Sequence, residues 1–257
     1  MTTATPPAGA QAIARAMTIL RAFDDSHPQW GLSELARTTG LNKTTTYRLL
    51  SALEREGLIA QNPVTEVYRL GPESIALGAR ALRSNDLRAT SRVHLESLAE
   101  RTGETATLEV LAGKEMLILD EVQSRALIGT SPSVGTRWPA HATSTGKVLL
   151  ADLPVNERRA LLGARLAKLT SRTITSHRAL NAELTRVRDR GFAVANEELD
   201  TGYVAVSAPV RGHDSHIVAA LSVGGPSVRM TQARVAGIAT LTRAAATKIS
   251  RQLGYKA

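Results

Sequence analysis

Residues 32–59 read LSELARTTGLNKTTTYRLLSALEREGLI. Gly40 and Gly57 are typical helix ends, because glycine readily adopts the left-handed conformation that follows a last helical turn. Apolar residues before each glycine recur at three- and four-residue steps, the spacing of one helix face. We therefore expect a short helix capped by Ser33, a turn at Gly40, and a second helix from near Asn42 to about Glu56.

The flanking segments complete a recognisable order of elements. The apolar spacing from Ile13 to Phe23 predicts a helix over residues 12–23. Beyond Gly57, the β-prone runs LIA and VYRL lie on either side of a turn around Asn62 and Pro63. Helix, short helix, turn, helix and hairpin is the order of a winged helix-turn-helix, which we assign to residues 11–71.

The helix after Gly40 has two unlike faces. At about 100° per residue, the core side gathers Thr46, Leu49, Leu50 and Leu53. The opposite side is polar and basic, with no acid before Glu54. Such a face suits the major groove of DNA, where Arg48 can fork a guanine. A solvated amphipathic helix is the alternative interpretation. The predicted DNA-contacting residues are Ser33, Asn42, Lys43, Thr44, Thr45, Tyr47, Arg48, Ser51, Arg55 and Arg69.

The rest of the 257-residue chain predicts a second, α+β domain. Residues 1–10 are expected to form a disordered tail, and Pro72 opens a linker helix over residues 72–84. The second domain is assigned to residues 85–257. Its expected helices span residues 87–101, 144–151, 156–162, 179–191 and 231–253, and its strands include residues 107–112, 116–122, 126–130, 192–195, 203–210 and 217–223.

Composition narrows the function classes. The net charge of +9 favours a polyanionic partner, yet residues 1–84 hold nine basic and seven acidic side chains, so most of the excess lies in the second domain. DNA affinity should then depend on a few placed residues. The chain lacks cysteine, which excludes disulfides and thiolate metal sites. It shows neither a signal peptide nor an apolar run of roughly 18 residues, so we expect a cytoplasmic protein without membrane association.

Five separated blocks resemble the IclR family of bacterial transcriptional regulators. Besides residues 32–59, they are VYRLGP, WPAHATSTGKVLLADLP, GFAVANEELDTGYVAVSAPV and IVAALSVGGPSVRMT, in this order. The resemblance implies a GAF-like effector-binding domain, a linker helix used in dimerisation, and a pseudo-palindromic double-stranded DNA operator. It also implies a homodimer, or a tetramer built as a dimer of dimers, without a cofactor. The wing departs from the family's short glycine turn, because it reads NPVTE.

The resemblance also implies an effector site for a small organic acid in the second domain. The Thr145–Gly146–Lys147 step should offer free N–H groups to a carboxylate. Relatives that bind polar keto acids carry polar groups where this chain has Ala195, Ala205 and Gly224, so we expect a roomier, less polar pocket for an aromatic or medium-length acid. The alternative interpretation is that Trp138 and Tyr203 are simply aromatic residues of the hydrophobic core. The predicted lining is Trp138, Ser144, Thr145, Gly146, Ala195, Tyr203, Ala205, Ser222 and Gly224.

The two alternative classes of protein are an enzyme and an architectural DNA-binding protein. The chain has no GxSxG, GxxxxGK[ST] or GxGxxG motif, which disfavours an enzyme. His213 and His216 flank Asp214, but the segment is better explained as a solvated turn than as a metal site. We expect His141 to have a structural role. We expect the adjacent Glu197 and Glu198 to lie in a loop or at the pocket rim. An architectural DNA-binding protein would not need the second domain.

Overall fold

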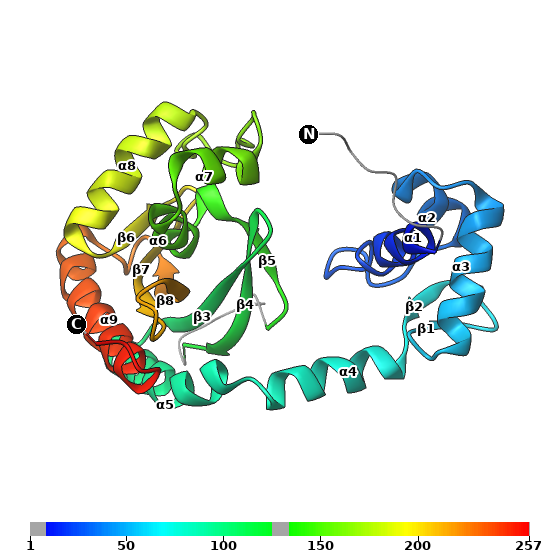
Figure 1. Cartoon of the computed structure of the whole chain (residues 1–257), viewed down its shortest axis with the longest axis horizontal. Helices are drawn as coiled ribbons and strands as arrows, with labels where there is room; N and C mark the ends of the chain where they lie inside the picture. The colour runs from blue at the N-terminus through cyan, green and yellow to red at the C-terminus, as the bar shows by residue number, and fades with distance from the viewer. Residues whose placement is uncertain (1–8, 125–133, 257) are drawn as a thin grey trace. The chain divides into compact units, whose positions relative to one another are not determined.

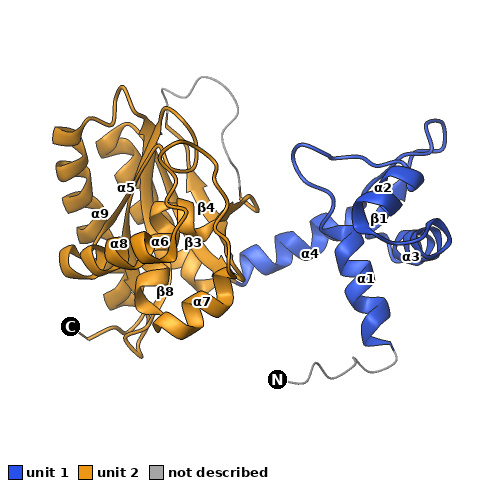
Figure 2. Cartoon of the chain, turned by 90° about the horizontal axis from the view of Figure 1, so that it is seen from above, with its two compact units in different colours: residues 1–84 blue, residues 85–257 orange. Residues whose placement is uncertain are grey.

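The computed structural model describes residues 9–124 and 134–256 of the chain, which divides into two compact units, residues 1–84 and residues 85–257 (Figure 2). Residues 1–8 of the predicted tail and the predicted strand over residues 126–130 lie outside the described residues. The predicted end of the tail at residue 10 is wrong, because Ala10 already belongs to the first helix. Each unit has a hydrophobic core of its own.

The first unit is a winged helix-turn-helix. Its core packs Ile19, Leu35 and Leu50 against Ile59 and Tyr68 of the hairpin, all of them buried. A further strand-like bridge pairs Trp30 with Tyr68. Its elements are α1 (Ala10–Leu20), α2 (Leu32–Thr39), α3 (Lys43–Arg55), β1 (Ile59–Gln61), β2 (Tyr68–Leu70) and α4 (Pro72–Arg83), as Figure 1 shows.

The helix boundaries in this unit follow from local capping. The expected cap at Ser33 is wrong: the cap position is the extended Gly31, two residues earlier, so Ser33 lies inside the first turn and makes no cap bond. Gly40 ends α2 with φ 69°, as expected. Asn42 caps α3, since its side chain accepts a hydrogen bond from the backbone N–H of Thr45. α1 ends at Leu20, earlier than predicted, although Phe23 is still buried.

The second unit is built on an antiparallel sheet, which confirms the α+β class. In the described residues its six strands run in the order β5-β4-β3-β8-β7-β6. The strand β5 is absent from our predictions, since three residues ending in proline carry little β signal. The strands are β3 (Thr105–Ala112), β4 (Glu115–Val122), β5 (Arg137–Pro139), β6 (Ala193–Asn196), β7 (Tyr203–Arg211) and β8 (Ile217–Pro226).

Helices cover both faces of this sheet. α5 (Asp86–Thr102) and α9 (Gln232–Gln252) lie side by side against one face, and α6 (Ser144–Asp152) packs on β7 and β8 from the other. Because both faces are covered, strand residues on either side are buried, and the period-two pattern of the sequence is weakened. A 3-10 turn, η1 (Ala140–Ala142), and the helices α7 (Val155–Leu162) and α8 (His177–Arg190) complete the unit.

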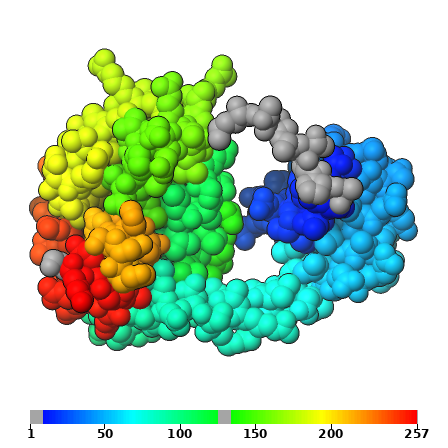
Figure 3. All heavy atoms as spheres, viewed as in Figure 1, coloured from blue at the N-terminus to red at the C-terminus, as the bar shows by residue number. Residues whose placement is uncertain are grey.

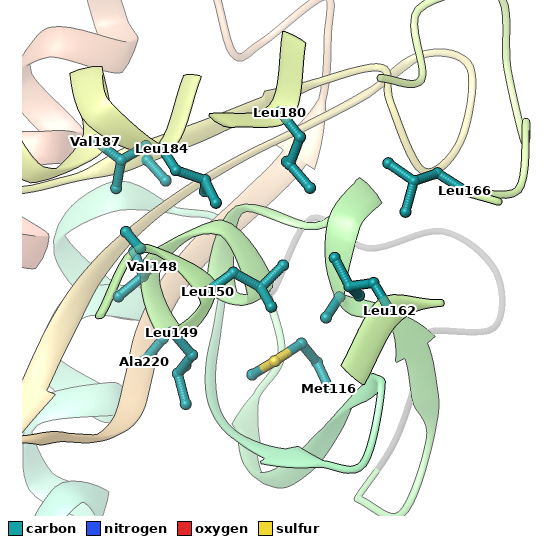
Figure 4. Close-up of a cluster of buried hydrophobic side chains, with 13 residues drawn as sticks. Met116, Val148, Leu149, Leu150, Leu162, Leu166, Leu180, Leu184, Val187 and Ala220 are labelled. Carbon is teal, nitrogen blue, oxygen red and sulfur yellow. The ribbon is translucent and has the colours of Figure 1, made fainter. Parts of the chain in front are cut away.

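A buried apolar cluster fixes the position of α6. Figure 4 shows Val148 and Leu150 of α6 facing Leu180, Leu184 and Val187 of α8. The other side of α8 is exposed on the surface of the unit, where it is yellow in Figure 3. Within the described ranges, no helix is both long and apolar enough to cross a membrane.

Candidate functional site

The exposed face of α3 carries the predicted contact residues. Thr46, Leu50 and Leu53 are buried in the core, as the helical spacing predicts. On the other side Tyr47 is 55% exposed and Arg48 is exposed. The remaining residues of this face are also accessible, with Lys43, Thr44 and Arg55 exposed and Thr45 and Ser51 half-buried.

Three predicted contacts lie off this face. Asn42 uses its side-chain oxygen to cap α3, at 2.8 Å from the Thr45 nitrogen, so only its amide NH2 is left to donate outward. Ser33 is exposed on α2 and Arg69 is exposed on β2, at the base of the hairpin. The turn of the hairpin is organised by Asn62, whose side-chain oxygen accepts from the N–H groups of Val64 and Thr65. No basic side chain stands in the segment 61–67.

A cavity of about 620 Å³ lies in the second unit, between the sheet and the start of α6. Eight of the nine predicted effector residues line it, and they come from β5, α6, β6, β7 and β8. Trp138 and Tyr203 are both among them and both are half-buried, so neither is only a core aromatic. Gly146 does not line the cavity, because it packs against η1, where a Cβ at position 146 would overlap the Ala140 carbonyl.

The predicted carboxylate seat at the start of α6 is partly wrong. The N–H of Gly146 donates to Oγ1 of Thr143 at 3.0 Å, and the N–H of Lys147 donates to the Thr143 carbonyl at 3.1 Å. These groups are therefore already used by the helix cap. The first-turn N–H groups of Ser144 and Thr145 have no hydrogen-bond partner within the described residues, and both residues line the cavity. The N–H groups left free at this helix start are therefore those of Ser144 and Thr145.

Two carboxyl groups in the cavity were missed by sequence reasoning. Glu109 of β3 is 6% exposed and accepts from the hydroxyls of Thr107, at 2.8 Å, and Thr145, at 2.6 Å. Glu121 of β4 lines the same cavity. Burial raises the pKa of both carboxyl groups. The signal was present, since Thr105, Thr107 and Glu109 alternate along one face of β3.

A third carboxyl group at the cavity wall is neutralised by arginines. Glu104 is 1% exposed and accepts from Arg229, at 2.9 and 2.7 Å, and from Arg234, at 2.9 Å. Its side chain lies against Gly225, where any Cβ would overlap it. This cluster joins the start of β3 to the end of β8 and the first turn of α9. It closes one side of the cavity.

Tyr203 of β7 places a phenol on the side of the cavity that is formed by the sheet. Burial, together with the nearby Glu109 and Glu121, raises the pKa of its phenol. The ring lies over Gly224 of the neighbouring strand, with no room for a side chain there. The phenol has no hydrogen-bond partner within the described residues and is therefore available to a ligand.

The histidine and acidic residues that could have suggested a metal site or an enzyme lie in a turn or make structural contacts. His213, Asp214 and His216 lie in the turn between β7 and β8. The ring of His141 bonds the Ala167 carbonyl at 2.8 Å. Glu198, in the loop after β6, forms a buried ion pair with Lys147 at 2.5 Å.

A winged helix with an exposed polar and basic α3, together with a separate unit that encloses a cavity, defines a ligand-binding class of DNA-binding transcriptional regulators. Residues 12–63 match the IclR helix-turn-helix domain, and residues 79–251 match the bacterial transcriptional regulator IclR C-terminal domain. The chain belongs to the IclR family, which confirms the expected family and fold. Its named relatives are transcriptional regulators. This chain is likewise a DNA-binding transcriptional regulator and not an enzyme.

Relatives match over nearly the whole chain. The HTH-type transcriptional regulator XynR of Escherichia coli strain K12 is 34% identical, over 96% of this chain and 98% of that protein. The IclR regulator from Alicyclobacillus acidocaldarius has a TM-score of 0.84 at 30% identity, over 95% of this chain and 99% of that one. An IclR homologue from Microbacterium hydrocarbonoxydans, complexed with 4-hydroxybenzoate, has a TM-score of 0.78 at 25% identity, over 94% and 98% of the two chains.

Proposed function

We propose that this protein binds a pseudo-palindromic operator as a dimer, or as a tetramer of two dimers, and changes its operator affinity when a small organic acid fills the cavity. The observation that carries the proposal is the cavity of about 620 Å³ in a unit separate from the DNA-binding helix. An architectural DNA-binding protein has no use for such a cavity. Its size fits an aromatic or medium-length acid.

The DNA half of the proposal assigns roles along α3. Arg48 offers a bidentate fork to guanine, Thr44 and Thr45 bond base edges or phosphates, and Tyr47 packs on a sugar or a thymine methyl. Lys43, Arg55 and Arg69 neutralise phosphates, with Asn42, Ser33 and Ser51 as polar contacts. Since the hairpin turn carries no cation, phosphate contacts come from its base at Arg69.

The effector half rests on how polar groups are arranged in the cavity. The free N–H groups of Ser144 and Thr145 at the start of α6 suit a carboxylate. Ser222 and Tyr203 offer hydroxyls, whereas Ala195 and Ala205 leave an apolar wall for a ring or chain. Gly224 is covered by the Tyr203 ring. The Microbacterium homologue, complexed with 4-hydroxybenzoate, supports an aromatic acid.

Exposed apolar side chains support self-association. α4 has no buried residue, yet Ile75 is 73% exposed and Leu77 is 48% exposed. An apolar helix face in water costs free energy, and a second copy of the helix would cover it. Effector binding would then shift the subunits through α4 and change the spacing of the two reading helices.

The test begins with selection of operator sequences from a random DNA library by the full-length protein. We expect an enriched pseudo-palindrome whose half-sites lie one or more helical turns apart. Operator affinity and melting temperature are then measured with glyoxylate, pyruvate, benzoate and 4-hydroxybenzoate. Larger effects from the benzoates support the proposal. Binding of the small keto acids alone would refute the aromatic preference, and an operator affinity that no acid alters would favour the architectural alternative.

A further inference from the structure

Two carboxyl groups face the cavity without a cation. Thr107 of β3 pairs with Glu121 of β4, so Glu121 lies across the sheet from the residue that bonds Glu109. Neither carboxyl group lies within salt-bridge distance of a basic side chain in the described part of the chain. Oε2 of Glu121 is buried and accepts no hydrogen bond there. Two ionised carboxylates sharing one low-dielectric space are unfavourable, so one is expected to hold a proton.

The other charged groups of the cavity do not offset the repulsion between these two carboxyl groups. Arg229 is held by Glu104. Arg137 of β5 leans toward Glu115 at 3.7 Å and is 48% exposed. Asp200 adds a further carboxyl group to the lining, and the remaining polar neighbours of Glu109 are uncharged, namely Thr107, Thr145, Ser222 and Tyr203. Every element packed around Glu109 therefore brings either a neutral group, a negative group or a cation that is already paired.

Glu109 is the better placed of the two to be the neutral acid. Its Oε1 accepts from the Thr107 hydroxyl, and its Oε2 lies 2.6 Å from Oγ1 of Thr145. From Thr145 a hydroxyl chain continues to Oγ1 of Thr143, at 3.3 Å, and ends at the Ala140 carbonyl, at 3.4 Å. Both threonine hydroxyls donate to Glu109, so a proton on Oε1 would keep both bonds and would still be free to donate into the cavity. Burial, which raises the pKa of Glu109, also favours the protonated acid.

We propose that Glu109 is an uncharged carboxylic acid in the folded protein at neutral pH and donates a hydrogen bond to the carboxylate of the bound effector. This rests on the proposed function for the identity of the ligand as an acid. The same Thr145 carries the free N–H at the start of α6, so the proton of Glu109 and the helix N–H groups converge on one place. An ionised Glu109 would repel an acid there, whereas a neutral one adds a donor.

The first experiment needs no effector. Infrared difference spectra of the full-length protein at neutral pH compare the wild type with Glu109→Gln and with Glu121→Gln as the matched control. We expect the carbonyl-stretch band of a protonated carboxylic acid in the wild type and in the Glu121 variant, and its loss in the Glu109 variant. A Glu109→Gln spectrum that retains the band, a wild type without it, or a band lost in both variants would each overturn the assignment.

The second experiment measures binding of 4-hydroxybenzoate and benzoate by calorimetry, after melting curves have shown that each variant is folded. Glu109→Gln keeps a neutral donor, so its affinity should stay within about threefold of the wild type, whereas Glu109→Leu should lose about tenfold or more. Equal losses in the two variants would mean that Glu109 acts as an ionised acceptor, which contradicts the proposal. If no acid binds the wild type, the effector class fails while the infrared result still decides the state of Glu109.

Discussion

The phenol of Tyr203 occupies the space that a side chain at Gly224 would need. A Cβ at position 224 would lie 2.8 Å from Cζ of Tyr203 and would overlap its hydroxyl oxygen. The absence of a side chain at Gly224 therefore keeps the Tyr203 ring flat against the sheet and holds the cavity open.

Gly224→Ala should force the Tyr203 ring toward the cavity. We expect a loss of about 1–3 kcal/mol in the free energy of unfolding, typical of overpacking, and weaker binding of 4-hydroxybenzoate. Urea denaturation and calorimetry measure the two effects. Gly237→Ala in α9 is the control, because a Cβ there meets no atom within 4 Å. It should leave binding unchanged and raise stability by up to about 1 kcal/mol. Unchanged binding in Gly224→Ala would contradict the role given to this contact.

Arg48→Ala should weaken operator binding by about 1–3 kcal/mol and relax the base preference at one position of each half-site, if Arg48 forks a guanine. Fluorescence anisotropy with the selected operator and its single-base variants measures both. Arg178→Ala, which removes an equal charge from an exposed position on α8, should have little effect. An equal loss on all sequences would instead make Arg48 a phosphate contact.

Asn42→Ala should destabilise α3, because it removes the side-chain oxygen that accepts from the Thr45 N–H at 2.8 Å. The expected loss in the free energy of unfolding of the first unit is about 1 kcal/mol. Asn42→Asp keeps the cap but places a negative charge near the phosphates, so it should retain stability and weaken DNA binding. Thr44→Ala is the stability control. A stable Asn42→Ala variant would show that the cap contributes little.

The sequence determined α3 more fully than the cavity, for physical reasons. Helical spacing is local, so Thr46 and Leu50 indicated the buried side directly. Glu109 follows Leu108 at a register irregularity of β3, and both are buried because helices cover each face of the sheet. The alternation of Thr105, Thr107 and Glu109 places the three on one face of β3, but it does not show which of the two covered faces borders a cavity. The contact between Thr145 and Glu109 joins residues 36 positions apart, which no local pattern shows.

Glu109→Gln should alter the pH dependence of stability. The pKa of Glu109 is raised by burial in the folded state from an ordinary value of 4.5. At low pH, Glu109 is protonated in both the folded and the unfolded chain. As the pH rises above the ordinary value, the unfolded chain releases its proton first, so the free energy of unfolding falls by about 1.4 kcal/mol per pH unit until the folded pKa is reached. Glutamine does not titrate.

We therefore expect the stability of Glu109→Gln, relative to wild type, to increase as the pH rises above about 5, until the folded pKa of Glu109 is passed. Urea denaturation at several pH values measures this difference, and Glu121→Gln tests whether the second carboxyl contributes. A constant difference between wild type and Glu109→Gln across this range would mean that the folded pKa is not raised.

Lys147→Met should destabilise the second unit strongly. Its Nζ lies 2.5 Å from Oε1 of Glu198 and 2.9 Å from the Val194 carbonyl, and the lysine side chain is 1% exposed. Loss of one partner leaves a buried charge, at a cost of about 3–5 kcal/mol in the free energy of unfolding. Adding Glu198→Gln removes that charge and should recover most of the loss. Arg172→Met is the matched control, since Arg172 is 54% exposed beside Glu197 and should cost less than about 1 kcal/mol. A double variant no more stable than Lys147→Met would show that packing of the lysine stem, and not the ion pair, holds the loop after β6 against α6.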